Sequence, residues 1–413
     1  MKLRALLSVP IATWIFAGCQ PELNEPEQLD TVRVLAVKKS FPFARPGTDV
    51  DFRMLWFDGR SEPGQGEDDV EVVWFSGCVN PPGDLFYLCY LQLAYAGLLL
   101  ESPGFSPGDS ITFTPASEPG QPAEPVDLVR TGLGPNFVYP VPSNLIDNHP
   151  APDNPEQPPY GVAYTFFTAC AGQVGLQEQW RDLAQRIGEG FATETGGEDG
   201  SASGGSGVAD ELGRLVAEGR LPRTFPLACY GDSGRQLGPD QFVAGYSTLY
   251  AYADVENENP VVRGMRVDEG GYELPDESDP VCVGDQCVGG DSPDDEQLSS
   301  EDCADYVACI STCDKKSRDD CPSYEVAVLL DPSDVEDNEL SGGSEQMWIQ
   351  YYTSAGSLDG DVKLVNDPTT GFNEDTSCKL RAPEEPGPFF VWGVIHDARG
   401  GVNWARAAVL AIN

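Results

Sequence analysis

Apolar and polar residues alternate along several short segments of this chain, and that spacing constrains the fold more than any other feature. In VDFRMLWF (50–57) the apolar residues fall on one face: Val50, Phe52, Met54 and Trp56. In VEVVWF (70–75) the same spacing groups Val70, Val72 and Trp74. A period of two is typical of a half-buried β-strand. The chain is therefore predicted to be mainly β.

Further strand-like segments recur, separated by clusters drawn from 35 prolines and 45 glycines, which favour turns. The first group comprises TVRVLAVKK (31–39), GVAYTFFTAC (161–170) and FVAGYSTLYAYA (242–253). The second comprises VVRGMRV, YEVAVLL (324–330), MWIQYYT (347–353), FFVWGVI (389–395) and VNWARAAVLAI (402–412). ENENP (256–260) reads as a linker between them. Two β-sandwich domains are predicted, at 31–255 and 256–413.

An insertion with helical spacing interrupts the first domain at about 173–222. Two sets of apolar residues recur every three or four positions: Leu176, Trp180, Leu183 and Ile187, then Val208, Leu212 and Leu215. A Gly/Ser-rich loop (193–207) joins them, which predicts a helical hairpin. Cys170 and Cys229 flank this insertion, and a disulfide between them would close its base. A second disulfide is predicted between Cys78 and Cys89.

A second insertion, at about 276–322, is acidic and rich in cysteine. It holds Cys282, Cys287, Cys303, Cys309, Cys313 and Cys321. No C-x2-C spacing and no histidine occurs there, so disulfides are favoured over a zinc site, and no metal is predicted. Ser299 followed by Asp302 resembles a capping box, so CADYVACISTC (303–313) is predicted to be a helix with Cys309 and Cys313 on one face.

The uncharged stretch LFYLCYLQLAYAGLLL (85–100) is shorter than the roughly 20 apolar residues that span a bilayer. It is predicted to be a buried helix or a pair of strands, with a sticky surface for a partner as the alternative.

The first 18 residues have the pattern of an export signal. Lys2 and Arg4 precede an uncharged apolar run, and Phe16, Ala17 and Gly18 stand before Cys19. This run resembles the lipobox of bacterial lipoproteins, in which the cysteine is acylated and becomes the first mature residue. The resemblance implies lipidation of Cys19, a polar tether over 19–30, and, from Gln20, sorting to the outer membrane.

The charge and the cysteine content of the chain indicate which partners and which cellular compartment to expect. The 67 acidic against 25 basic residues give a net charge of −42, which argues against nucleic acid and anionic lipid as partners because phosphates would be repelled. Without Cys19, 11 of the 12 cysteines remain. That number is normal in an oxidising compartment, and an odd count leaves one thiol unpaired or paired between chains.

The close of the chain carries a family resemblance. The last two strands are joined by His396, Asp397, Ala398, Arg399, Gly400 and Gly401. A strand, D-x-x-G-G and a strand resemble the end of bacterial immunoglobulin-like and polycystic-kidney-type domains, and YTSAGSL (352–358) resembles their middle strands. The whole chain resembles Gram-negative surface lipoproteins, abundant in myxobacteria, that open with a VRVLAV strand. The resemblance implies two immunoglobulin-like sandwiches and a surface location, and it carries no activity.

The sequence motifs that could indicate an enzyme are weak. CYGDSG (229–234) resembles the nucleophile segment of trypsin-like proteases, with Ser233 as nucleophile. However, Arg235 replaces the second glycine, and the only upstream histidine, His149, stands in an unrelated context. A turn explains the segment equally well. A carboxylate pair of the glycosidase kind is a further alternative, and His396 is expected to be a strand or turn residue.

The acidic runs 276–279, 291–296 and 331–339 offer oxygen ligands for calcium, but none has the EF-hand register, so solvated acidic loops are expected. The sequence thus predicts a lipid-anchored, non-enzymatic binding, adhesion or scaffold protein without a cofactor, with an unknown protein or glycan partner. An extracellular hydrolase using Ser233 or a carboxylate pair, and a calcium-dependent adhesin, are the alternatives.

Overall fold

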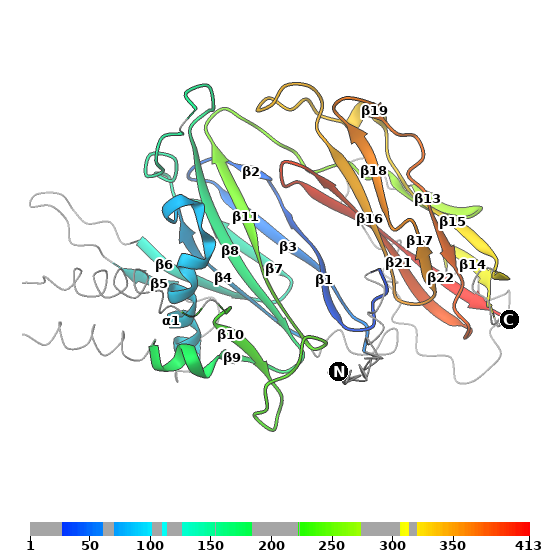
Figure 1. Cartoon of the computed structure of the whole chain (residues 1–413), viewed down its shortest axis with the longest axis horizontal. Coiled ribbons are helices and arrows are strands. Elements are labelled where there is room, and N and C mark those ends of the chain that lie inside the picture. The colour runs from blue at the N-terminus through cyan, green and yellow to red at the C-terminus, as the bar shows by residue number, and fades with distance from the viewer. Residues whose placement is uncertain are drawn as a thin grey trace, which may run out of the picture.

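The computed structural model describes residues 27–60, 70–100, 110–113, 126–152, 154–183, 222, 224–273, 306–313 and 320–413. Every sheet in these ranges draws its strands from one side of residues 253–263. We call the part before this segment the N-terminal unit and the part after it the C-terminal unit (Figure 1). The prediction of a mainly β chain is confirmed.

The described residues of the N-terminal unit form eleven strands in three sheets. Their bounds are β1 (Val32–Lys39), β2 (Phe43–Ala44), β3 (Asp49–Asp58), β4 (Glu71–Val79), β5 (Ser110–Phe113), β6 (Val126–Leu133), β7 (Asn136–Pro140), β8 (Tyr160–Cys170), β9 (Gln173–Leu176), β10 (Leu227–Tyr230) and β11 (Phe242–Tyr252). A central sheet runs in the order β2-β11-β8-β4-β6-β5, a second in the order β1-β3-β7, and β9 pairs with β10.

Both faces of the central sheet are buried at β4 and β8, which the sequence pattern did not predict. Val70, Val72 and Trp74 face the β1-β3-β7 sheet, as the alternation of β4 predicted. Val73 and Phe75 point the other way, into a core shared with helix α1 (Tyr90–Leu100) and the β9–β10 pair. The unit therefore has three layers rather than the two of a simple sandwich (Figure 1).

Helix α1 accounts for most of the apolar stretch 85–100. A short 3-10 turn (Phe86–Cys89) precedes it, and Cys89 is bonded to Cys78 of β4, as predicted. Gly97 lets the helix approach the β9–β10 pair closely, since a Cβ there would lie 2.7 Å from a methyl carbon of Leu227. In the described ranges no helix is long and apolar enough to cross a membrane.

The base of the first insertion is held as predicted by a disulfide between Cys170 and Cys229. A helix starts at residue 178, and the side chains of Trp180 and Leu183 are buried against the α1 core. Leu176, predicted to belong to that helix, instead ends strand β9, because it pairs with Leu227 across the disulfide-closed base. The rest of the predicted hairpin, at 184–221, lies outside the described residues.

The C-terminal unit consists of two sheets that face each other. Its strands are β12 (Gly264–Val267), β13 (Gly270–Glu273), β14 (Ala308–Ser311), β15 (Ser323–Leu329), β16 (Met347–Thr353), β17 (Ser357–Asp359), β18 (Val362–Asp367), β19 (Gly371–Phe372), β20 (Cys378–Arg381), β21 (Gly387–Asp397) and β22 (Val402–Ile412). The sheet orders are β13-β12-β15-β20-β17 and β14-β22-β21-β16-β18-β19. One apolar core lies between them.

The helix predicted for 303–313 is wrong in its described part. Residues 308–311 form β14, which pairs in parallel with the outer edge of β22. Ile310 is 2% exposed and lies in the core. An unpaired β22 edge would leave its backbone groups without partners, and β14 satisfies them, which outweighs the local capping pattern.

The remaining cysteines divide into bridged and free ones. Cys313 is bonded to Cys321, and Cys309 is also in a disulfide. Cys378, on β20, is a buried free thiol, which agrees with the odd number of cysteines left after Cys19. Cys282, Cys287 and Cys303 lie outside the described residues.

The two units meet across a further apolar cluster, separate from their own cores. It contains Leu29, Leu35, Ala36 and Phe57 from the N-terminal unit, and Phe390, Trp392, Val394, Val402 and Trp404 from the C-terminal unit. A bulge in β1 between Val34 and Ala36 shifts the register, so that Leu35 and Ala36 are both buried. Backbone bonds join Leu29 N to Thr353 O and Thr353 N to Glu27 O, each at 2.9 Å.

Candidate functional site

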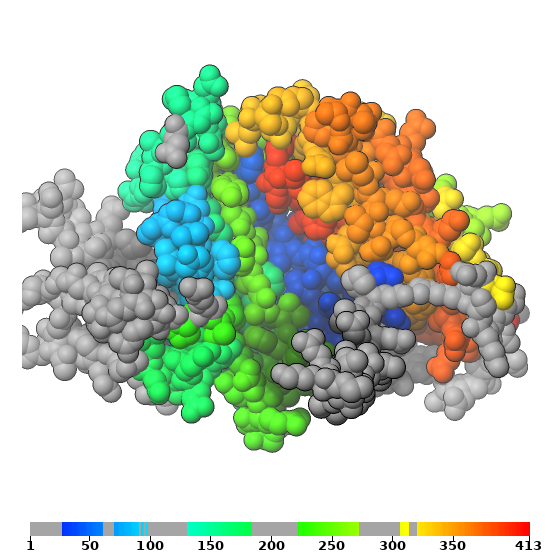
Figure 2. All heavy atoms as spheres, viewed as in Figure 1, coloured from blue at the N-terminus to red at the C-terminus, as the bar shows by residue number. Residues whose placement is uncertain are grey.

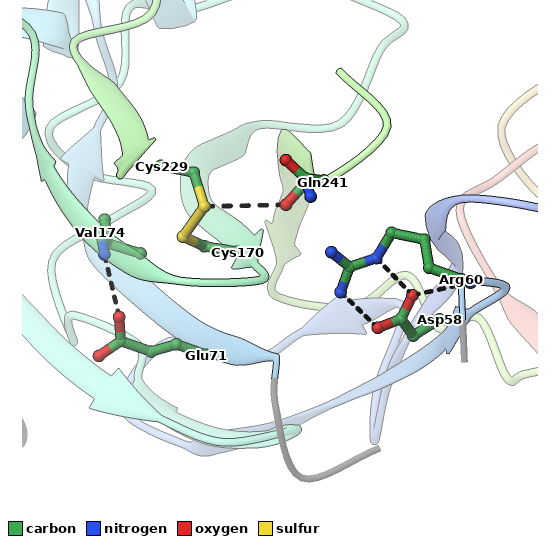
Figure 3. The surroundings of a disulfide bond; sticks show 7 residues. All are labelled: Asp58, Arg60, Glu71, Cys170, Val174, Cys229 and Gln241. Atoms are coloured by element: carbon green, nitrogen blue, oxygen red, sulfur yellow. Dashed lines mark hydrogen bonds and ion pairs between the residues drawn. A yellow bond between two sulfur atoms is a disulfide. The ribbon is translucent and has the colours of Figure 1, made fainter. Parts of the chain in front are cut away.

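The protease-like segment CYGDSG forms a tight turn. Its first residue, Cys229 of β10, is bonded to Cys170, the last residue of β8. The Cys229 Sγ lies 3.7 Å from the carbonyl oxygen of Gln241 (Figure 3). The Gly234 N–H donates to Gly231 O at 2.8 Å, and Gly234 has a positive φ of 70°. Ser233 is exposed at the tip of this turn. The turn explanation of G-D-S-G thus fits the observed backbone.

His149 lies at the opposite end of β8 from Ser233. Its ring packs on Tyr160, the first residue of β8, with centroids 4.2 Å apart, whereas Cys170 ends that strand. Ten residue steps of extended chain span about 33 Å. The structure therefore does not bring Ser233 and His149 together, and His149 is not placed to take a proton from Ser233.

His149 instead joins a polar cluster around Asp84. His149 Nε2 lies 3.0 Å from Asp84 Oδ1, and the Tyr160 hydroxyl donates to Asp84 Oδ2 at 2.9 Å. The Tyr164 hydroxyl donates to the backbone oxygen of Asp84 at 2.8 Å. Burial, then the Asp84 hydrogen bond and charge, raises the pKa of Tyr160 to about 12. These bonds fix the segment before α1 onto β8, a positioning role.

His396 and the acidic run 331–339 also have structural surroundings. His396 lies on β21 and stacks on Trp348 at 5.2 Å, and burial lowers its pKa from 6.5. In the run, Asp331 caps a 3-10 turn, Asp334 pairs with Arg263 at 2.7 Å, and Glu336 pairs with Arg399. The described residues hold no group of three or more His, Cys, Asp or Glu placed to bind a metal. The other two acidic runs, 276–279 and 291–296, and Cys19 lie outside those residues.

The strongest candidate site is a cleft of about 370 Å³ where the two units meet, which we call the junction cleft. It is lined by Lys39, Phe43, Thr248, Tyr250, Tyr252, Asn338, Leu340, Ala398, Arg399 and Gly400. The end of β1 and the β2–β11 edge form one wall, and the β21–β22 hairpin with the loop before β16 forms the other. In Figure 2 the red tip of this hairpin lies between the green of β11 and the yellow-orange of that loop.

Lys39 is the most unusual residue of the cleft. It is 3% exposed, and its Nζ donates to Thr248 O at 2.8 Å. Burial lowers its pKa to about 8, and the negative charge of Asp397 opposes that shift. Gly400, in the hairpin turn at a φ of 93°, leaves room for the amine, because a Cβ there would lie 3.2 Å from Nζ.

The hairpin wall is held rigidly by a buried charge cluster. Asp397 Oδ1 accepts from the N–H groups of Arg399 at 2.7 Å and Gly401 at 2.8 Å. Arg399 bonds Glu336 and also Glu345, the latter at 2.9 Å. Burial raises the pKa of Glu345, partly offset by its hydrogen bond from Arg399. The arginine charge is thus matched within the wall, whereas no carboxylate in the described ranges lies within 4.0 Å of Lys39 Nζ.

Sequence reasoning identified the D-A-R-G-G turn but none of the cleft's binding groups. The signal was present in part: two lysines end the first strand, and alternation requires one of them to face inward. Nothing in the sequence indicated that the facing partner would be a turn some 360 residues away.

No protein-family model matches the sequence, and no curated protein matches it. Among solved structures, the chain aligns with native α-2-macroglobulin of E. coli at 10% identity and a TM-score of 0.19, over 93% of this chain and 16% of that one. It aligns with dimeric latent PorU from Porphyromonas gingivalis at 7% identity and a TM-score of 0.16, over 93% of this chain and 24% of that one. The chain thus spans a quarter or less of each, and neither likeness carries an argument about fold or function.

Proposed function

We propose that this protein is a lipid-anchored, non-enzymatic binding protein of the outer membrane, and that the junction cleft is its binding site. The observation that carries the binding role is a buried lysine, Lys39, in the wall of a cleft between the two units, with no carboxylate of the described residues within 4.0 Å of its Nζ. Clefts between domains are preferred ligand sites, and ionisable groups with shifted pKa values gather at functional sites.

The anchor and the fold family belong to the same proposal. The lipobox-like residues before Cys19 and the polar tether support acylation and export. The two facing sheets of the C-terminal unit and its D-x-x-G-G hairpin support an immunoglobulin-like relationship. The net charge of −42 supports a partner other than nucleic acid.

The binding role is tested by filling the cleft. Ala398 is exposed and lines the cleft, so Ala398→Trp adds bulk there without disturbing the core. Ala244→Trp places the same bulk at an exposed position of β11 outside the cleft lining and serves as control. We expect ligand-observed NMR against a panel of small metabolites and saccharides to find binders that Ala398→Trp loses and Ala244→Trp keeps. A panel without any Ala398→Trp-sensitive binder would contradict the cleft as the site.

The anchor is tested by mass spectrometry of the mature amino terminus in the native host. We expect a diacylglyceryl group on Cys19, and we expect Cys19→Ser to release the protein from the outer-membrane fraction. Cys378→Ser, which removes a buried thiol of the folded body, is the control and should leave the fractionation unchanged. An unmodified terminus would refute the anchor and leave the cleft proposal standing.

A further inference from the structure

The polar wall of the junction cleft offers hydrogen-bond donors from Lys39 and Asn338. Lys39 Nζ carries three N–H groups, of which one bonds Thr248 O. Asn338 uses its side-chain oxygen to accept from the N–H groups of Leu340 and Ser341, at 3.0 and 3.2 Å. That leaves its amide nitrogen as a donor at the cleft. A ligand that satisfies this wall must bring acceptor oxygens.

Arg399 adds to this excess of donors. It is 8% exposed, and its Nε–H is buried without a partner in the described part of the chain. An unpaired buried donor costs free energy, roughly 1–3 kcal/mol. The guanidinium charge itself is matched by Glu336 and Glu345. Lys39 is therefore the cation of the cleft whose charge no carboxylate in the described ranges matches within 4.0 Å.

The opposite wall of the cleft is aromatic. Phe43 and Tyr252 pack with ring centroids 4.8 Å apart, and Tyr250 and Tyr252 lie on the same face of β11. Leu340, 39% exposed, extends the apolar surface at the rim. Such a wall suits a flat or ring-shaped body, because aromatic rings gain from stacking as well as from burial.

We propose that the junction cleft binds a small organic acid, with its carboxylate on Lys39 and its apolar ring against Tyr250, Tyr252 and Phe43. This assignment rests on the proposed function, since it names the ligand class of the same cleft. A carboxylate on a buried ammonium forms a charge-assisted hydrogen bond. It also supplies the ion-pair partner that the described protein residues do not provide within 4.0 Å of Nζ.

The test uses phenylacetate as the probe, with phenylacetamide and phenethylamine as a neutral and a cationic match of similar shape. Isothermal titration on the ectodomain should detect phenylacetate at about 10 mM, a concentration that reveals dissociation constants near 1 mM. We expect the amide and the amine to bind at least tenfold more weakly. Lys39→Met should lower phenylacetate affinity at least tenfold, whereas Lys379→Met, at an exposed lysine of β20, should not change it.

Proton uptake gives a readout that does not depend on any variant folding. Because the free amine has a pKa of about 8, binding of the anion at pH 9 should take up close to one proton, measured from the dependence of the heat on buffer ionisation. Above that pKa the affinity should fall about tenfold per pH unit. The charged or titratable groups around Lys39 are Asp397, Arg399, Tyr250 and Tyr252, with Glu336, Glu345 and His396 behind the hairpin wall. The pKa values of both tyrosines are raised and that of His396 is lowered, so these three do not change charge between pH 8 and 9.

Ionic strength separates this site from weak binding to surface cations. The net charge of −42 repels an anion at long range, and salt near 0.15 M screens that repulsion more than the buried contact. Phenylacetate affinity should therefore hold or rise with added salt. An affinity that falls with salt would indicate surface cations and overturn the proposal.

Two outcomes distinguish this inference from the proposed function. If the amide or the amine binds as well as phenylacetate and Ala398→Trp abolishes that binding, the cleft is a binding site but not for acids. If phenylacetate fails to bind while other panel members bind in an Ala398→Trp-sensitive manner, the acid assignment fails alone. If nothing binds in such a manner, both fail.

Discussion

Burial of the Lys39 amine lowers the stability of the folded protein. A lysine that is 3% exposed, without a carboxylate within 4.0 Å in the described ranges, holds its charge only at an energetic penalty. Its pKa of about 8 instead of 10.5 measures that penalty, roughly 3 kcal/mol when the amine is charged. A residue that lowers the stability of the fold at neutral pH indicates a position at which function, rather than stability, determines the amino acid.

Lys39→Met should stabilise the protein at pH 7 by about 2 kcal/mol, since the buried charge is removed and one hydrogen bond is lost. The wild-type folded pKa lies below the unfolded one, so the unfolded chain binds more protons between pH 8 and 10.5. Wild-type stability therefore gains a rising contribution across that window, and Lys39→Met should lack it. Urea unfolding at pH 7, 8 and 10 measures the difference. Parallel curves for the two proteins would contradict the burial of a charged amine.

Cys378 should be unreactive while the protein is folded. It is 2% exposed, and burial raises its pKa to about 12, so almost no thiolate exists at pH 8. We expect iodoacetamide to leave the Cys378 peptide unmodified in the native protein and to label it fully in guanidinium. Rapid native labelling would show that β20 opens.

At this scale the sequence predicted the Cys78–Cys89 and Cys170–Cys229 pairs, because each pair flanks a segment that folds back locally. It did not predict Lys39 as a site residue. Alternation places a side chain on a face, but it does not show what that face meets.

Gly393 lies where the two sheets of the C-terminal unit approach each other closely. It lies in the middle of β21, and a Cβ there would be 2.2 Å from a methyl carbon of Val328 on β15. Such contacts in a packed core force backbone or rotamer shifts. The glycine therefore sets the spacing of two elements rather than a turn.

Gly393→Ala should lower the free energy of unfolding by about 1–3 kcal/mol, by overpacking. Adding Val328→Ala should recover part of the loss, so a double-mutant cycle should give a favourable coupling. Gly238→Ala is the matched control, because a Cβ at Gly238 meets nothing within 4 Å. Strictly additive losses at 393 and 328 would refute the close approach.

Strands were the elements that the sequence predicted best. The predicted strands at 347–353 and 402–412 coincide with β16 and β22, since each pairs along its whole length with β21. The prediction for 303–313 failed because the competing partner, β22, is about 100 residues further along the chain. Local capping signals carry no information about such pairing.

The whole molecule depends on the contact between its units. Phe57 of β3 is 7% exposed and packs on Trp392 of β21 with ring centroids 4.9 Å apart. Around it lies a cluster of apolar residues that belongs to neither unit's own core. We call this cluster the seam. It joins the three layers of the N-terminal unit to the two sheets of the C-terminal unit, and it thereby fixes both walls of the junction cleft.

Phe57→Ala should uncouple the units. Removing a buried ring costs about 3–5 kcal/mol, and here the loss falls on the seam. We expect calorimetry to resolve two melting transitions in Phe57→Ala. Phe41→Ala, at a side chain that is 55% exposed, should melt like the wild type. One unshifted transition in Phe57→Ala would mean that the seam contributes little.

Turn-rich segments separate two groups of strands in the sequence, and the domain division at 31–255 and 256–413 drawn from them stays a prediction. The third layer and the apolar contact between the units could not be predicted from the sequence. Both faces of β4 are apolar in the sequence. Alternation along one strand does not show whether its second face packs against another layer.

The bonds between Leu29, Glu27 and Thr353 determine how mechanical load enters the protein. Tension applied to the chain ahead of Glu27 reaches β16 through these bonds before it reaches β1. Both units are then dragged together. A body tethered in this way keeps its seam closed under strain, whereas attachment through β1 alone would pull one half away from the other.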